Sequence, residues 1–147
     1  MSEKKIDKYS YELGVIDCFC EMVAAGLKTM ALSHPCQSRE ERDSYTDDVQ
    51  DICNRYGVRY YGEDDPFLTD LFPEEMCRDT FYFIFYLDDH TLDRYLELKR
   101  EKTALLEKGE YDVAHRREIA FAYGKMLSYS DEGIERLLGK TAQVKES

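Results

Sequence analysis

The sequence is poor in features that mark several common protein classes. It has no tryptophan and only three prolines in 147 residues, and it contains no internal repeat, low-complexity block or Pro/Gly/Ser-rich linker. Its longest strongly apolar run, residues 81–87, is far shorter than the roughly 20 residues needed to cross a bilayer. No apolar stretch follows the charged N-terminus, so we expect no secretory signal peptide and place the protein in the cytosol.

Short catalytic and metal-binding motifs are also missing. The chain has no GxGxxG or GxxxxGK[ST] loop, no GxSxG elbow and no HExxH pair, which disfavours the usual nucleotide enzymes and serine hydrolases. The five cysteines are odd in number and include no CxxC pair, so we predict reduced thiols rather than disulfides or zinc ligands. Four of them are expected as small apolar core residues, whereas Cys36 falls in a predicted loop.

Basic side chains are outnumbered by acidic ones, 20 to 31, which gives a formal charge of −11 and a pI near 4.7. This balance disfavours direct binding to nucleic acid or to anionic lipid, because both need a basic face. The hydrophobic fraction of 43% argues against disorder. We predict one domain over residues 1–139, with C-terminal helices from about residue 90, and a flexible polar tail over residues 140–147.

Apolar spacing predicts the elements of the first half. Residues 10–25 have helical periodicity, and Ser38 with Glu41 forms a capping box before a second helix that ends at Gly57. Residues 28–32 and 58–61 flank that second helix and favour strand. The region from 27 to 61 is about 35 residues long, which fits a strand–helix–strand unit.

Residues 80–87 are the clearest strand, since they are almost continuously aromatic and β-branched. Continuous apolarity predicts a strand covered on both faces, as in a parallel sheet. Three helices should follow, over about 90–108 and 110–129 and in a short segment after Ser130. We therefore predict an α/β fold with a small, at least partly parallel three-stranded sheet covered by helices. The alternative, an all-α bundle, would need Phe81–Leu87 to be helical. If that strand lies at an exposed edge, a homodimer is expected.

The predicted sheet suggests where a ligand would bind. In open parallel sheets, ligands bind beyond the carboxyl ends of the strands. If the three strands run the same way, the groups that follow them converge at one edge: Ser33, His34 and Cys36 after the first, Glu63, Asp64 and Asp65 with Asp70 nearby after the second, and Asp88, Asp89 and His90 after the third. Of these, His34, Asp64 and Asp88 are the candidate ligands of a divalent metal, which would suit hydrolysis of a phosphate or another ester.

Simpler roles exist for the same residues. Acidic turns after strands are common, and Asp88 or Asp89 can cap the following helix. His34 and Cys36 resemble a base and a thiol nucleophile, but only Pro35 separates them and no third group can be assigned. The segment from Ser33 to Pro35 can equally grip a ligand, with the serine donating to an anion.

No single signature identifies the function. The preferred hypothesis is a small cytosolic binding or regulatory domain that recognises a protein partner or a small ligand without catalysis. The first alternative is the metal-assisted hydrolase built on the histidine and carboxylates. The second is an acidic protein that imitates nucleic acid, although the acids do not form long runs and the apolar segments suit an ordinary core.

Overall fold

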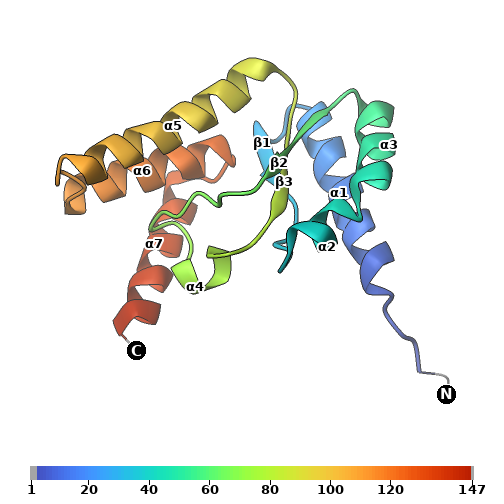
Figure 1. The fold of residues 1–147 in the computed structure, drawn as a ribbon, viewed down its shortest axis with the longest axis horizontal. Helices are drawn as coiled ribbons and strands as arrows, with labels where there is room; N and C mark the ends of the chain where they lie inside the picture. Colours follow the sequence, from blue (N-terminus) through green and yellow to red (C-terminus); the bar gives the residue numbers. More distant parts are fainter. Residues whose placement is uncertain (1–2, 147) are drawn as a thin grey trace.

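A computed structural model describes residues 3–146, which form two helical layers on either side of a small sheet (Figure 1). The fold is mostly helical, with 59% of residues in helices and 11% in strands. In chain order the elements are α1 (Lys8–Ala24), β1 (Met30–Leu32), α2 (Arg39–Asp43), α3 (Thr46–Tyr56), β2 (Arg59–Glu63), α4 (Glu74–Cys77), β3 (Tyr82–Tyr86), α5 (Asp89–Glu107), α6 (Val113–Met126) and α7 (Asp131–Glu146).

The sheet has the order β1-β3-β2, and both of its pairings are antiparallel. The predicted parallel sheet is therefore wrong, because β1 and β2 run the same way but β3 lies between them in the opposite direction. The cause is the connection from β2 to β3. A parallel return needs a long crossover, usually a helix, whereas residues 64–81 hold only the four-residue α4 and bring the chain back beside Glu63. The all-α alternative is also wrong, because residues 82–86 are a strand.

Strand β3 is buried along its whole length and divides the core in two. Tyr82, Ile84 and Tyr86 face the layer of α5, α6 and α7, whereas Phe83 and Phe85 face the layer of α1 and α3. Figure 1 shows these layers on the two sides of the sheet. Coverage on both faces explains the continuous apolar run, which a central antiparallel strand requires just as a parallel one does.

Local sequence signals account for the helix ends of the first half. The Ser38 hydroxyl accepts a hydrogen bond from the Glu41 backbone N–H at 3.0 Å, as the capping box predicts. The Glu41 carboxylate, however, accepts from the Gln37 N–H at 2.9 Å, one residue before the usual partner. Gly57 ends α3 with a φ of 71°, a left-handed conformation that favours glycine.

The last helix extends further than the sequence suggests. Residues 140–146, expected as a flexible tail, continue α7, and Thr141 is buried with its hydroxyl donating to the Leu71 carbonyl at 3.4 Å. The expectation of a homodimer rested on residues 80–87 forming an edge strand, but β3 is paired along both of its sides. Within residues 3–146, no helix has the length and apolarity needed to cross a membrane.

Candidate functional site

The structure divides the predicted site residues between the two ends of the sheet. Strands β1 and β2 finish where β3 begins, so Ser33 and Asp64 lie near one end while Asp88 lies at the other. The Asp88 carboxylate accepts from the Thr91 N–H at 3.2 Å and caps α5, and Asp89 forms an ion pair with Arg59 at 2.6 Å. His90 is exposed in the first turn of α5. The three strands therefore do not deliver their groups to one edge.

Ser33 and Cys36 are part of the sheet rather than a ligand loop. The Ser33 hydroxyl accepts from the Phe83 N–H at 2.8 Å, and the Ser33 N–H donates to the Phe83 carbonyl at 2.9 Å. The Cys36 backbone bonds Phe81 in both directions and extends the pairing by one isolated bridge. These bonds hold the segment 33–36 against β3 and leave the serine hydroxyl committed to the backbone.

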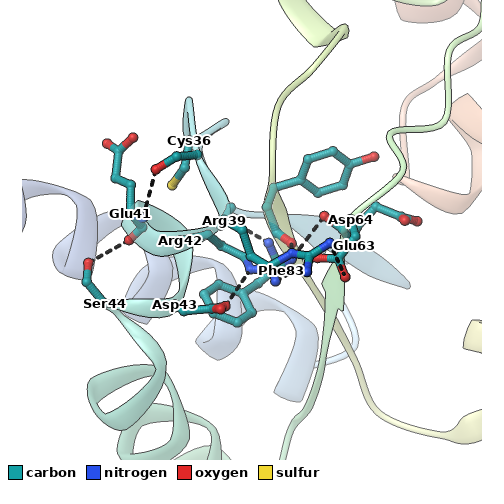
Figure 2. A network of polar contacts seen from close by, with 12 residues as sticks. Cys36, Arg39, Glu41, Arg42, Asp43, Ser44, Glu63, Asp64 and Phe83 are labelled. Atoms are coloured by element: carbon teal, nitrogen blue, oxygen red, sulfur yellow. Dashed lines mark hydrogen bonds and ion pairs between the residues drawn. The ribbon is translucent and has the colours of Figure 1, made fainter.

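A buried arginine organises the polar groups at this end of the sheet (Figure 2). Arg42 on α2 is 5% exposed, and its guanidinium donates to the Glu63 carbonyl at 3.0 Å and pairs with Asp64 at 2.7 Å. It lies 5.5 Å from the centroid of the Phe83 ring. Gly62 makes room for it, because a Cβ at that position would lie 3.1 Å from the guanidinium. Figure 2 shows Arg42 extending from α2 toward Glu63 and Asp64.

The Glu63 side chain continues this network to the other helical layer. It is 2% exposed and accepts hydrogen bonds from the Tyr95 hydroxyl at 2.6 Å, the Lys99 ammonium at 3.1 Å and the Asp65 N–H at 2.9 Å. Tyr95 and Lys99 belong to α5, so the network joins α2 to α5 across the sheet. Of the two acids predicted as metal ligands, Asp64 therefore pairs with Arg42 at this end of the sheet. The buried Glu63 carboxylate beside it is matched by Lys99, which is the usual condition for burying charge.

The His34 imidazole lies between the Cys36 thiol and the Glu12 carboxylate. Its Nε2 lies 3.4 Å from the Cys36 Sγ, and its Nδ1 lies 3.1 Å from a Glu12 carboxylate oxygen, although without the alignment of a hydrogen bond. Glu12 is the third group that the sequence could not assign, because α1 brings it from a distant part of the chain.

Burial makes this cluster a poor nucleophile. Cys36 is 1% exposed, and burial raises the pKa of its thiol to about 11, so the thiol stays protonated at neutral pH. Burial also lowers the pKa of His34. A protonated thiol that solvent does not reach cannot attack a substrate, so the cluster suits packing better than covalent catalysis. Across residues 3–146, no group of three or more His, Cys, Asp or Glu residues is arranged to hold a metal.

A cavity of about 310 Å³ lies elsewhere, between the 68–72 loop, α4, α5 and the start of α6. Its wall combines three apolar side chains with hydroxyl and charged groups. The lining residues are Leu68, Thr69, Asp70, Phe72, Glu74, Lys102, Leu106, Tyr111 and Arg116. Of the residues predicted from the sequence, only Asp70 lies here, because the others belong to the two ends of the sheet.

The Tyr111 ring is held between two cations. The Lys102 ammonium lies 5.5 Å and the Arg116 guanidinium 4.9 Å from its centroid. Arg116 is fixed in turn by a two-pronged ion pair with Asp70, at 2.6 and 3.0 Å. Lys102 donates to the Leu68 carbonyl at 2.5 Å. The protein's own groups therefore hold both cations and the Tyr111 ring in place on this wall.

Two polar groups of this wall are not fully compensated for the hydration that they lose on burial. The Tyr111 hydroxyl is buried and has no hydrogen-bond partner among the residues that the structure describes. Burial raises the pKa of Tyr111, and burial together with the nearby Arg116 lowers the pKa of Lys102. No sequence motif indicates this cavity, because its residues come from separate segments whose meeting depends on helix packing.

Comparisons with protein-family models, with curated proteins and with solved structures find no match. The geometry of the chain itself therefore decides which function is proposed.

Proposed function

We propose that this protein is a cytosolic binding domain that recognises a small polar molecule without catalysis, and that the 310 Å³ cavity is its binding site. The observation that carries the proposal is the wall of this cavity, where apolar side chains lie beside Lys102, whose ammonium contacts the Leu68 carbonyl and the Tyr111 ring. A lysine ammonium has three N–H groups, so two remain for a ligand once the Leu68 carbonyl has accepted one. All five cysteines are free thiols, which is typical of a reducing compartment.

The cavity wall is shared about equally between polar and apolar groups, so it is more polar than a typical small-molecule site and suits a small polar ligand. In such sites a few polar groups fix the orientation of the ligand. Here Leu68, Phe72 and Leu106 supply apolar surface, and Lys102 supplies a polar contact. Because the ring of Tyr111 is already held by its cation contacts, little ordering is needed when a ligand binds.

No specific observation favours the two alternatives. The hydrolase hypothesis needed three strands with the same direction, and β3 runs against the other two. Its candidate ligands His34, Asp64 and Asp88 have separate partners: Glu12 for the histidine, Arg39 and Arg42 for Asp64, and the α5 backbone for Asp88. Imitation of nucleic acid stays a prediction from the net charge alone.

The test uses tryptophan as a reporter, since the natural chain has none. A library of small polar molecules is screened by thermal shift on the natural protein, because a ligand of the folded state raises its stability. Hits are then titrated into Leu106→Trp, which places an indole on the cavity wall, and into the matched control Leu27→Trp. Both leucines are exposed, at 55% and 70%, and only Leu106 lines the cavity.

The expected result is a set of hits that change the fluorescence of Leu106→Trp and not of Leu27→Trp. The proposal fails if no molecule raises the melting temperature. It also fails if every hit leaves the fluorescence of both variants unchanged.

A further inference from the structure

The backbone of the central strand β3 bonds its two neighbouring strands alternately. The Ser33 N–H donates to the Phe83 carbonyl at 2.9 Å, so the Phe83 backbone faces β1. Successive residues of an antiparallel strand direct their N–H and C=O groups to opposite sides. The residues on either side of Phe83, which are Tyr82 and Ile84, therefore direct their backbone groups toward β2.

The same alternation leaves part of the β2 backbone unused. Glu63 and Tyr61 lie opposite those two residues of β3 and use their backbone groups for the bonds between the strands. The N–H and C=O groups of Tyr60 and Gly62 therefore point away from β3. Within residues 3–146, no hydrogen bond joins the backbone of Tyr60 or Gly62 to another group. The outer side of β2 is thus an open edge of the sheet.

Solvent reaches this edge, and little in the strand blocks the approach of another strand. Tyr60, Tyr61 and Gly62 are half-buried, whereas all five residues of the central β3 are buried. Open edges are commonly protected by a proline, a lysine or a bulge. The strand β2 contains neither of these residues and pairs with β3 without a break. An edge of this kind binds another extended strand through main-chain hydrogen bonds.

A second copy of β2 matches this edge. If two copies pair antiparallel about Tyr61, Tyr60 of each copy lies opposite Gly62 of the other, and each such pair exchanges both of its N–H···O bonds. In this register alone, all the open groups of Tyr60 and Gly62 bond each other. The large Tyr60 ring then lies across from a residue without a side chain, a cross-strand pair that suits glycine in a sheet. Tyr61 lies opposite its own copy, and aromatic pairs of this kind stabilise sheets.

The charges at the two ends of β2 favour the same arrangement. The strand begins at Arg59 and is followed by Asp64 and Asp65, and these three side chains are all exposed. Antiparallel pairing brings the cation of each copy beside the acids of the other, whereas parallel pairing would bring like charges together. The net charge of −11 opposes association, but physiological salt screens exposed charges beyond about 8 Å.

We propose that the chain forms a homodimer in which β2 of each copy continues the sheet of the other, so that two three-stranded sheets become one antiparallel sheet about a two-fold axis. The sequence suggested a dimer through residues 80–87, but that strand is central and the open edge is β2. The edge lies outside the 310 Å³ cavity, so this inference does not depend on the proposed function.

Sedimentation velocity tests the dimer over a range of protein concentrations at about 0.15 M salt. The expected species has twice the 17.3 kDa mass of the chain. Tyr60→Pro removes an edge N–H that β3 does not use, and Tyr60→Ala is the matched control, because it removes the same ring but keeps the N–H. The proline variant should raise the dissociation constant of the dimer at least about tenfold more than the alanine variant does. Far-UV circular dichroism checks that both variants are folded.

A disulfide tests the register without removing a hydrogen bond. In the proposed pairing, the two copies of Tyr61 form a non-hydrogen-bonded pair with Cα atoms about 4.5 Å apart, within the roughly 4.4–6.8 Å that a disulfide spans. Tyr61→Cys should therefore give a disulfide-linked dimer with glutathione disulfide as the oxidant. The background is Cys18→Ser, which removes the exposed natural thiol. The matched control is Tyr11→Cys, at an exposed position of α1, and it should stay monomeric in non-reducing gels.

Three outcomes overturn the inference. A monomer at every concentration, with no cross-link through position 61, would leave the edge to an extended segment of another protein. A dimer that Tyr60→Pro and Tyr60→Ala weaken equally would have its interface elsewhere. Equal cross-linking through positions 61 and 11 would contradict the pairing about Tyr61.

Discussion

Replacing Arg42 with methionine tests whether the polar network at the sheet end stabilises the fold. Methionine keeps an apolar chain of similar length on α2 but removes the guanidinium. The Glu63 carbonyl then loses its 3.0 Å hydrogen bond in a buried setting, and the Tyr82 carbonyl loses a longer contact of 3.5 Å. Asp64 is about half exposed and can recover hydration, so its lost ion pair contributes little.

The expected magnitude follows from these contacts. A buried carbonyl left without a partner costs about 1–3 kcal/mol, and loss of the cation from the Phe83 ring adds about 0.5–2 kcal/mol. The half-exposed ion pairs add at most about 1 kcal/mol. Relief from burying a charge offsets part of this sum. We therefore expect Arg42→Met to lower the free energy of unfolding by about 3 kcal/mol and the melting temperature by roughly 10 °C.

Urea unfolding followed by far-UV circular dichroism measures this loss, since the chain has no tryptophan to report it. Arg39→Met is the matched control, because Arg39 is on the same helix and pairs with the same Asp64 at 3.5 Å, but its side chain is 61% exposed. The control should lose no more than about 1 kcal/mol. Equal losses in the two variants would refute a stabilising role specific to the buried guanidinium.

Four further predictions concern other parts of the molecule. Gly124→Ala should lower the free energy of unfolding by about 1–2 kcal/mol, because the new Cβ would lie 2.6 Å from a buried isoleucine of α7. Gly139→Ala has open space around its new Cβ and should raise the free energy of unfolding by about 0.5–1 kcal/mol. The reverse order of stability in thermal melts would contradict the packing of α6 on α7. Burial lowers the pKa of His34, so the unfolded chain binds a proton at this histidine more readily than the folded chain does. The free energy of unfolding should therefore fall as the pH drops through 6.5. His34→Gln should reduce this pH dependence in unfolding titrations. The hydrogen bond to Asp112 raises the pKa of His115. The stability that this contact contributes is therefore present below pH 6.5 and lost as the pH rises through the raised pKa. An unchanged pH dependence of stability in His115→Gln would contradict this. Cys18 should be the first thiol to react with a disulfide reagent in the native state, because it is exposed, and fast labelling of the three buried thiols before unfolding would count against the described core.

The sequence predicted the elements well because their signals are local. The strand in residues 80–87 and the glycine that ends α3 were both expected, since β preference and a left-handed cap depend on neighbouring residues. The direction of the strand was not predicted correctly, because a strand buried on both faces has the same apolar pattern in a parallel and in an antiparallel sheet. The connection did contain a signal: residues 64–81 include Pro66 and Pro73, which disfavour a long crossover helix, and the structure has only the four-residue α4 there.

The candidate site was largely out of reach for the same reason. Helical periodicity shows that Lys102 and Arg116 lie on helices, but it does not show that the two helices meet over Tyr111. Asp70 was named for its position after a strand, whereas its contact with Arg116 depends on the loop returning to α6. Likewise, Glu12 could be linked to His34 only once α1 was packed beside β1.

The central position of β3 affects how the chain unfolds and how it folds during synthesis. Its five side chains alternate between two separate hydrophobic clusters, so this one short strand contributes buried side chains to both. Loosening it would open both halves at once, which favours a single unfolding transition for the whole chain. On the ribosome, β1 and β2 are made before the strand that lies between them, so neither pairing of the sheet can be completed until residue 86 has been added.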